Sequence, residues 1–348
     1  MAAPVPIDAP DALLTLLLGD VGRDVARMRV LQAVERITAF LRTDAATMTG
    51  ARSGQWMDLM QLAEQHGVST ADLQLALDHA PLAVHTLAGL HPSVAAHALA
   101  LQRRMAFRRT ARGIAHRCTV ISLGPSCSAW SVFNRWGFRD APASVGSFNP
   151  FCLAGHRPSA IADMLLGGIE AYASVGMLMS APWPNGKVVV RRSDAAALWS
   201  HHDGEHWHAD AFQPFRDSIA ELMGNLDRAL ASETGELKVF VFGHTTVNDP
   251  ARLLPLFRGL SDALDQRCRG PWRLLAFNVP ADAKLAPQPL LEALTPAVSL
   301  ISMPMRADGL LYEWWEPAIY NSEAGVAWEA AIADLTHAAL VGWAPKDG

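Results

Sequence analysis

The spacing of apolar residues divides the chain into a first part with a helical period and a second part with a mixed pattern. Up to residue 112, apolar side chains recur at steps of three and four, as at Leu13, Leu16, Leu17 and Val21, which is the period of one buried helix face. Alanine, leucine, glutamine and methionine dominate there, and no run indicates a strand. We therefore predict an all-helical N-terminal region over residues 1–112.

Beyond residue 112, short apolar runs alternate with helical patterns. The apolar runs predict strands at residues 119–123, 188–190, 239–242, 274–279 and 298–302. Helical spacing predicts helices at residues 215–230, 249–265 and 325–340. Strands that alternate with helices indicate βαβ units, and continuous apolar strands are typical of a buried parallel sheet. We predict an α/β domain over residues 113–348, a Rossmann-like three-layer sandwich with a mostly parallel sheet.

Residues 61–77, QLAEQHGVSTADLQLAL, have the length and the central glycine of a helix-turn-helix. A helix that reads DNA needs Lys or Arg to neutralise phosphates, yet residues 54–91 contain neither and include several acidic residues. We therefore predict an ordinary helical pair and no nucleic-acid partner. An arginine-rich run at residues 103–117 predicts the solvated side of a connecting helix, and a protein partner held by the N-terminal helices stays open.

Composition narrows the class of protein. Of the 348 residues, 50% are hydrophobic and 18% are charged, which suits a packed core rather than a disordered chain. The formal net charge of -5 is spread without long runs of one sign, so no strong field draws the chain to nucleic acid or to an anionic membrane. No apolar stretch approaches the roughly 20 residues that span a bilayer, and we expect no membrane partner.

Cysteine usage points to a reducing compartment. The four cysteines, Cys118, Cys127, Cys152 and Cys268, form no C-x-x-C pair, which argues against a structural zinc site and against a disulfide framework. The apolar run at residues 13–18 is flanked by aspartates, where a signal peptide would carry Lys or Arg. We expect a soluble cytoplasmic protein without a cofactor or a metal ion.

The strongest chemical signal is TVISLGPSCSAWSVFNRWGF at residues 119–138, where an apolar strand meets a turn and then a helical pattern. Ser126 and Cys127 fall in the turn or first helical turn at the carboxyl end of the strand, the edge where α/β sheets bind ligands. Gly124 lets the backbone bend there without a Cβ clash. A thiol at a helix N-terminus has its pKa lowered by the helix dipole, so one interpretation of Cys127 is a reactive nucleophile. The other is a small buried residue without a chemical role, which is common for a free cysteine.

A nucleophilic cysteine needs a base, and the densest supply of histidine is SHHDGEHWHAD at residues 200–210. One interpretation is a Cys–His relay oriented by a carboxylate or an amide. A second is a metal site, although the spacing matches no metal signature such as H-E-x-x-H. A third is a polar surface loop, which Gly204 favours.

The segment ISLGPSCSAWSVFNRWGF resembles the opening of a bacterial family labelled papain-like cysteine peptidases, whose function is largely unestablished. The family pattern S-L-G-x-x-C is matched at residues 122–127, and R-x-G-F-R at residues 135–139. Asn149 stands where the family carries Asp. The family also has a histidine segment before a helix and a strand, which implies His208, with His206 second, as the base. The resemblance covers about residues 120–242 and implies a Cys–His hydrolase.

The order of strand, glycine and serine is also similar to the SGNH esterases and acyltransferases. Gly124, Pro125 and Ser126 stand where that class has G-D-S, with Pro125 in place of the acid. GHTTVND at residues 243–249 is loosely like its G-x-N-D block. Asp334 and His337 have the spacing of its D-x-x-H block, but lie within a predicted helix. This resemblance implies an SGNH-like fold.

The leading hypothesis is a hydrolase or acyl-transfer enzyme. Its nucleophile is Cys127, its base is His208 or His206, and Asp210 orients the base. The predicted substrate contacts are Gly124, Ser128, Asn149, His244 and Asn248, with backbone N–H groups around Cys127 and Ser128 as the oxyanion hole.

Two alternatives remain open. One is an SGNH-like serine esterase with Ser126 as nucleophile and His337 and Asp334 as its partners. The other is a non-catalytic module that binds a glycan or a nucleotide, for which a lowered thiol pKa has no use. The substrate is an unknown small molecule, glycan or peptide.

Overall fold

The computed structural model describes residues 100–344, except residues 101–102, 105, 109, 112, 116, 140, 234–235, 249–251, 281, 283, 285, 306–311 and 315. Every described residue from 100 to 115 is helical, and the rest of the predicted N-terminal helical region lies outside the described residues. The chain divides into two compact units. The first holds the described residues before 112 with Asn134–Asp140 and Glu313–Ala330, and the second holds most of the remainder.

The second unit is built on a five-stranded sheet with the order β1-β6-β7-β9-β8. Its strands are β1 (Cys118–Ser122), β6 (Leu237–Thr245), β7 (Trp272–Asn278), β8 (Leu290–Ala293) and β9 (Val298–Ser302). β1, β6, β7 and β9 are parallel, and β8 joins the edge antiparallel to β9. The predicted α/β class with a mostly parallel sheet is confirmed. The prediction rested on continuous apolar runs, which are typical of strands covered on both faces, and every residue of β1 and of β9 is indeed buried.

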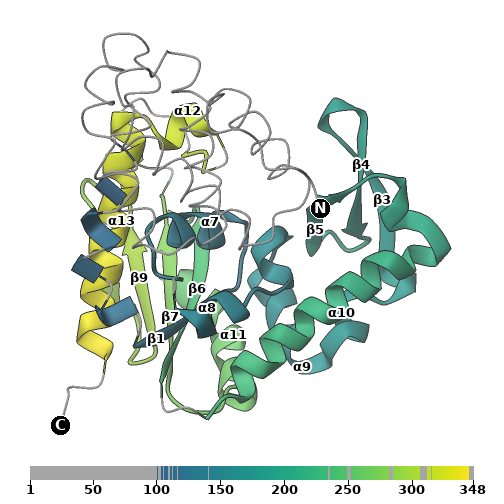
Figure 1. Cartoon of the computed structure of the whole chain (residues 1–348), viewed down its shortest axis with the longest axis horizontal. Coiled ribbons are helices and arrows are strands. Elements are labelled where there is room, and N and C mark those ends of the chain that lie inside the picture. The colour runs from purple at the N-terminus through teal and green to yellow at the C-terminus, as the bar shows by residue number, and fades with distance from the viewer. Residues whose placement is uncertain are drawn as a thin grey trace, which may run out of the picture. The chain divides into compact units, whose positions relative to one another are not determined.

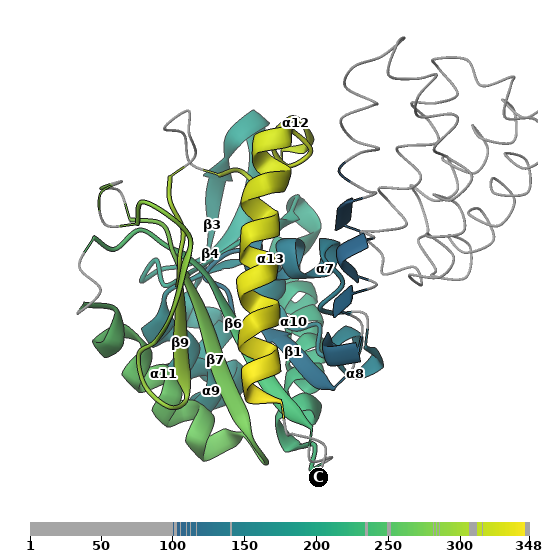
Figure 2. The same ribbon diagram turned by 90° about the vertical axis from the view of Figure 1, so that its left-hand side faces the viewer.

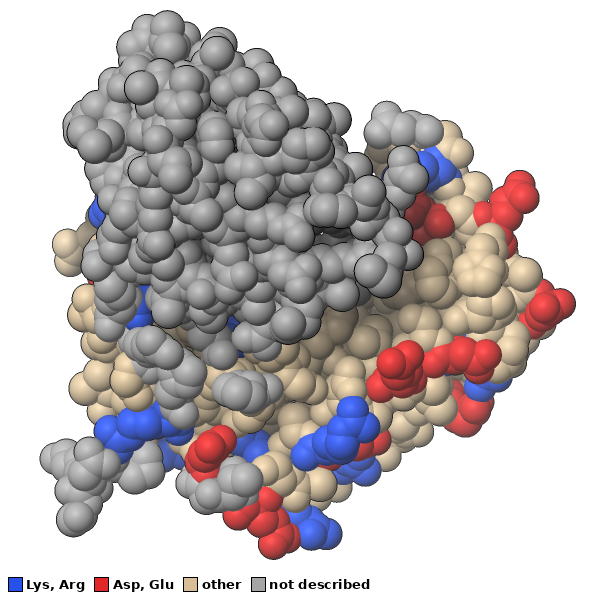
Figure 3. Space-filling model, in the orientation of Figure 1, with Lys and Arg blue, Asp and Glu red and all other residues tan. Residues whose placement is uncertain are grey.

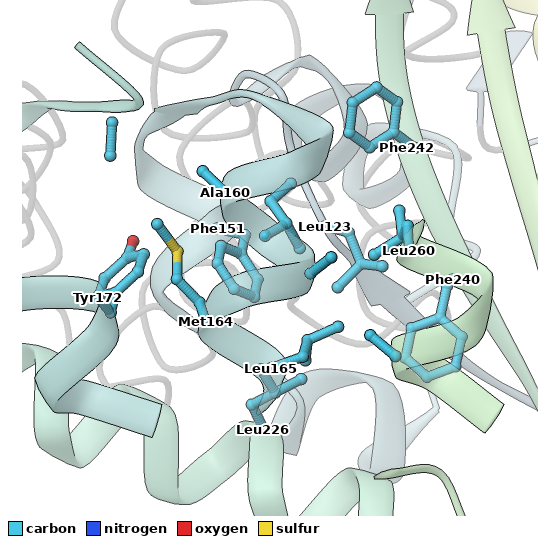
Figure 4. Packing of buried hydrophobic residues seen from close by; sticks show 14 of the residues in the cluster. Leu123, Phe151, Ala160, Met164, Leu165, Tyr172, Leu226, Phe240, Phe242 and Leu260 are labelled. Atoms are coloured by element: carbon cyan, nitrogen blue, oxygen red, sulfur yellow. The ribbon is translucent and has the colours of Figure 1, made fainter. Parts of the chain in front are cut away.

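Helices cover both faces of this sheet (Figure 1). α9 (Pro158–Ala173), α10 (Ala209–Ala231) and α11 (Leu253–Arg267) pack with one another, and their buried side chains form one core with the sheet. Figure 4 shows the core side chains of α9 and α10 meeting those of the strands. α7 (Ser128–Arg135) lies on the other face, where the ring of Phe133 packs 5.5 Å from that of Phe277. The part of α13 (Glu323–Trp343) that belongs to this unit runs along the same face (Figure 2).

A second, antiparallel sheet with the order β2-β5-β4-β3 is inserted between β1 and β6 in the chain. It consists of β2 (Gly155–His156), β3 (Leu178–Trp183), β4 (Lys187–Arg192) and β5 (Ala197–Asp203). The predicted strand at residues 188–190 is confirmed, but it pairs in this sheet and has no part in a βαβ unit. Short elements complete the unit, namely α8 (Pro142–Gly146), η2 (Pro150–Leu153), η3 (Val175–Met177), η4 (Pro184–Gly186) and η5 (Glu205–His208).

The first unit is organised around a buried carboxylate. Glu329 of α13 accepts hydrogen bonds from Arg104, from Arg135 and, at 2.7 Å, from the indole of Trp136. Both guanidinium groups also lie over the ring of Tyr320, which belongs to α12 (Pro317–Tyr320). A buried carboxylate is tolerated only when it is paired in this way.

None of the helices in the described part of the chain combines the length and the apolar character needed to cross a membrane.

The end of β6 touches the start of α7. The N–H of Gly243 donates to the carbonyl of Gly124, and a Cβ at position 243 would lie 2.5 Å from Ser128 Oγ and 3.1 Å from the backbone nitrogen of Ala129. Real Cβ contacts essentially never fall below 3.0 Å, so a side chain at position 243 would force the Ser128 hydroxyl to move and the first turn of α7 to shift by a few tenths of an ångström. The glycine is therefore required by this close approach.

We expect Gly243→Ala to destabilise the protein by about 1–3 kcal/mol, because overpacking forces backbone shifts. The matched control is Gly259→Ala in α11, where a Cβ meets nothing within 4 Å. That change should stabilise the helix by roughly 0.5–1 kcal/mol. Chemical denaturation of both variants checks the pair, and equal stability of the two would contradict the close approach.

Candidate functional site

The turn that follows β1 places Cys127 at the start of α7. The N–H of Leu123 donates to the carbonyl of Val241 at 2.8 Å, which continues the pairing of β1 with β6. Gly124 then adopts a φ of +87°, a value that favours glycine. The carbonyl of Cys127 accepts the N–H of Ser131 at 2.8 Å, so Cys127 caps the helix. The predicted position of the thiol at the carboxyl end of a strand and the beginning of a helix is confirmed.

A histidine from the second sheet meets this thiol. Nε2 of His201 lies 3.3 Å from Sγ of Cys127. His201 is in β5, where the pairing with β4 is irregular, since Val190 pairs with Trp199 but Val189 pairs with Asp203. Residues 200–202 therefore bulge from the ladder, and such bulges re-aim side chains beside functional sites. The bulge directs the imidazole of His201 to the thiol.

His202 anchors the bulge. Its side chain is only 5% exposed, and its ring packs edge-on 4.7 Å from Trp207 and 5.1 Å from Phe215. Adjacent residues of a strand point to opposite sides, so burial of His202 turns His201 outward. The hydrophobic environment holds the pKa of His202 down to about 4, with the neighbouring His201 lowering it further.

The histidines chosen from the sequence lie elsewhere. Nδ1 of His208 is hydrogen-bonded to the hydroxyl of Ser180 at 2.8 Å, and His206 is exposed, with its ring against Trp207. Neither contacts Cys127 among the described residues, so the choice of His208 or His206 as partner of the thiol is corrected to His201. The faint family pattern aligned the wrong histidine because the β-bulge, which decides the direction of each ring, has no signature in the sequence.

Asp210 does not orient a base at the thiol either. It lies at the start of α10 in a run of left-handed residues, with a φ of +47°, and it is exposed. The carboxylate that acts on His201 is that of Asp203, two residues along β5; desolvation lowers the pKa of His201, and Asp203 partly opposes this lowering. Asp203 itself is paired with Lys187.

The thiol and the imidazole are both uncharged at neutral pH. Burial raises the pKa of Cys127 to about 11, and its own backbone N–H only partly opposes this. Desolvation lowers the pKa of His201 below its usual 6.5, although the residue as a whole is exposed and Asp203 works in the opposite direction. The predicted lowering of the thiol pKa is therefore contradicted, because desolvation of the thiolate outweighs the helix N-terminus.

Ser126 and Ser128 bond to each other. Their hydroxyl oxygens are 2.8 Å apart, and the N–H of Ser128 donates to Ser126 Oγ at 3.3 Å. No histidine is bonded to Ser126 among the described residues. Asp334 and His337 lie inside the continuous helix α13, as the helical pattern of residues 325–340 predicted. The serine triad of the alternative hypothesis is therefore not assembled.

The remaining predicted substrate contacts have other roles. Asn149 is fully buried, and its amide nitrogen donates to the carbonyls of Ser122 and Ser147. Its amide oxygen accepts the N–H of Phe151, so the side chain connects the end of β1 to η2. The prediction of Asn149 as a substrate contact is therefore corrected to a structural role. Asn248 accepts the N–H of Asp282 at 3.2 Å. His244 follows Gly243 in β6, and its side chain lies outside the described part of the structure.

A buried hydrogen-bond network behind the turn was not predicted from the sequence. Trp199 donates its indole N–H to the hydroxyl of Tyr172 at 2.9 Å, and that hydroxyl lies 2.6 Å from Nε2 of His156. An indole only donates, so the hydroxyl of Tyr172 accepts from Trp199 and its own proton is available for Nε2 of His156. Burial lowers the pKa of His156 to about 3, which keeps this ring neutral.

His156 connects this network to the turn that precedes α7. Its backbone N–H donates to the carbonyl of Pro125 at 2.7 Å, and Nδ1 would lie 3.6 Å from a Cβ at Gly124. The second sheet therefore contacts this turn twice. His156 of β2 bonds to its backbone, and His201 of β5 contacts the thiol of Cys127.

No group of three or more histidine, cysteine or acidic side chains among the described residues could hold a metal ion. The described part of the face in Figure 3 shows positive and negative side chains mixed along α10, with no large area of one sign.

Comparisons with models of protein families, with curated proteins and with solved structures find no match for this chain.

Two buried neutral histidines make the free energy of unfolding depend on pH. Between pH 6.5 and 4, the unfolded chain binds protons at His156 and His202 that the folded chain does not, because both folded pKa values are lowered. The free energy of unfolding therefore falls as the pH falls, by at most about 1.4 kcal/mol per pH unit for each shielded histidine.

We expect His202→Phe, which keeps the aromatic packing, to make this pH dependence shallower. The exposed His206→Gln should leave it unchanged. Denaturant unfolding at a series of pH values checks this, and parallel curves for His202→Phe and the unmodified protein would contradict the assignment.

Proposed function

We propose that the protein is a Cys–His hydrolase or acyl-transfer enzyme, with Cys127 as nucleophile and His201 as general base. The observation that carries this proposal is the 3.3 Å contact between Sγ and Nε2 at the first turn of α7. Nucleophile and base within hydrogen-bond reach, at the carboxyl edge of a parallel sheet, are the arrangement that covalent catalysis requires. The papain-like family label, and an SGNH-like or Rossmann-like fold, remain expectations from the resemblance.

The protonation states favour a mechanism that starts from a neutral pair. The thiol donates to Nε2 of His201, which places the imidazole proton on Nδ1. As Sγ attacks the carbonyl carbon of an ester, thioester or amide, the thiol proton passes to Nε2. The imidazolium then returns this proton to the leaving group, and a thioester with Cys127 remains. Water or another acyl acceptor attacks the thioester, with His201 again as base.

The helix N-terminus would act on the transition state. The first N–H groups of α7 have no carbonyl partner within the helix and carry its positive partial charge. The N–H of Cys127 itself faces the sulfur and favours negative charge there. The predicted oxyanion donor at Ser128 is engaged by Ser126 Oγ at 3.3 Å, a long bond that an oxyanion can replace.

The substrate is proposed only as a class, an acyl donor with a reactive carbonyl. None of the four cysteines, all of which lie in the described part of the chain, forms a disulfide, which suits a reducing, cytoplasmic environment. No observation favours the serine esterase, since Ser126 lacks a base among the described residues, and none favours a purely binding role.

The test is covalent acylation of the full-length protein by p-nitrophenyl acetate. Mass spectrometry should locate the acetyl group on Cys127, and Cys127→Ala should abolish it. His201→Gln should slow acylation by about 10²- to 10⁴-fold, the range of general-base catalysis. The rate should rise with pH through a pKa below 6.5 and then level, because the neutral imidazole is the active form.

His208→Gln and His206→Gln are the matched controls, and both should acylate at the unmodified rate. A loss of acylation in His208→Gln with normal rates in His201→Gln would reject His201 as the base. Labelling spread equally over Cys127 and Cys268 would reject a specialised nucleophile altogether.

A further inference from the structure

The hydroxyl of Tyr172 joins the two strands of the second sheet that reach Cys127. Tyr172 belongs to the last turn of α9 and is fully buried. Its hydroxyl accepts the indole N–H of Trp199 at 2.9 Å and lies 2.6 Å from Nε2 of His156. Trp199 is in β5, the strand that carries His201, and His156 is in β2, the strand that bonds to the turn before Cys127. One hydroxyl therefore connects the strand of the imidazole with the turn of the thiol.

On β5, this bond is made at the last regular residue before the bulge. Pairing with β4 stops at Trp199 and resumes only at Asp203. Pairing with β2 involves only residues 197 and 198. The ladders therefore leave the segment that contains His201 without a regular partner. The fully buried side chain of Trp199, two residues earlier, determines where this segment begins.

On the side of the turn, His156 is fixed at both its side chain and its backbone. Its ring is nearly parallel to that of Tyr172, with the centroids 5.5 Å apart, and the residue is only 5% exposed. Its backbone N–H donates to the carbonyl of Pro125 at 2.7 Å, and Nδ1 would lie 3.6 Å from a Cβ at Gly124. A displacement of this ring would therefore be passed to the turn, which ends two residues after Pro125 at Cys127.

The groups of this network do not titrate near neutral pH. Burial raises the pKa of Tyr172 well above its usual 10, and burial lowers the pKa of His156 to about 3. Both side chains therefore stay neutral between about pH 4 and pH 9. Such a network holds a constant geometry over this range and supplies no proton to the thiol.

We propose that Tyr172 is a positioning residue for the Cys127–His201 pair, whose hydroxyl sets the distance between the thiol and the imidazole. This inference rests on the proposed Cys–His function. A base must lie within hydrogen-bond reach of the nucleophile, and a misplacement of about 1 Å can cost roughly 100-fold in rate. Without the hydroxyl, Trp199 and His156 lose the partner that they share, and the bulge and the turn are no longer held to one another.

Tyr172→Phe removes the hydroxyl and keeps the ring. At saturating p-nitrophenyl acetate we expect acylation of the full-length protein to slow about 10- to 100-fold, because the pair is displaced. The half-saturating concentration should not change, since Tyr172 is buried away from the substrate. The ratio of the two rates should be equal at pH 5 and at pH 9, because neither neutral group titrates in between.

A spectroscopic readout is independent of catalysis. The Nε2 signal of His201, measured by NMR, reports contact with the thiol. In Tyr172→Phe it should move towards its value in Cys127→Ala, because the imidazole and the thiol separate. A purely structural role of the hydroxyl would lower the free energy of unfolding and leave this signal in place.

Trp199→Phe breaks the same network from its other end and should slow acylation as well. If the indole acts through the hydroxyl, Trp199→Phe should cost much less in the Tyr172→Phe background than it costs alone. Trp272→Phe is the matched control, since it removes an indole hydrogen bond to Asp265 at the beginning of β7, the opposite edge of the parallel sheet from Cys127. It should change neither the acylation rate nor the Nε2 signal.

The proposal is overturned if the Nε2 signal stays in place in Tyr172→Phe, if this variant acylates at the unmodified rate, or if the costs of the two substitutions multiply fully. Denaturant unfolding confirms that each variant is folded, and Trp199→Phe decides the question if Tyr172→Phe does not fold. Failure of the proposed function is a separate outcome. An unmodified protein that is not acylated rejects the enzyme, while the Nε2 signal still decides whether Tyr172 positions the pair.

Discussion

Close contact between the ends of β1 and β6 is the constraint on which the site depends. The backbones of Gly124 and Gly243 are hydrogen-bonded where the two parallel strands end, and no side chain fits between position 243 and the first turn of α7. Because α7 follows the turn directly, this contact determines where its N-terminus and Cys127 lie. The second sheet meets the same turn through the backbone of His156, so the thiol is supported from both sides.

Desolvation gives this site its chemical character. The environment that positions Cys127 and His201 also disfavours charge on either group, since it raises the thiol pKa to about 11 and lowers the imidazole pKa. In this state the thiol of Cys127 keeps its proton in the resting protein and would transfer it to His201 only as the sulfur attacks. In the proposed mechanism, such a pair works in the manner of a serine–histidine pair, in which the base acts in the transition state. A resting thiol of this kind is also slow to oxidise or to be alkylated, because the thiolate is the reactive form.

Most strands of the parallel sheet and the position of Cys127 could be predicted from the sequence. The antiparallel sheet and the histidine that contacts the thiol could not. Apolar runs such as those at residues 239–242 and 298–302 identify buried strands because both of their faces are covered, and the glycine turn before Cys127 marks a helix start. The antiparallel sheet was missed because β2 has two residues, and β3 carries Pro182 and several exposed side chains. The histidine that contacts the thiol was misassigned because four histidines share one short segment. Only the bulge at residues 200–202 and the burial of His202 between Trp207 and Phe215 select His201.

The central claim is that Cys127 and His201 form an uncharged, hydrogen-bonded pair. Nitrogen chemical shifts of the His201 ring at pH 7, measured by NMR in the unmodified protein and in Cys127→Ala, test it most directly. The account predicts a neutral imidazole protonated on Nδ1, with an Nε2 signal that shifts when the thiol is removed. A doubly protonated ring that becomes neutral in Cys127→Ala would show a thiolate–imidazolium ion pair, and an Nε2 signal that does not respond would show that the two groups are not in contact; either result would contradict the account.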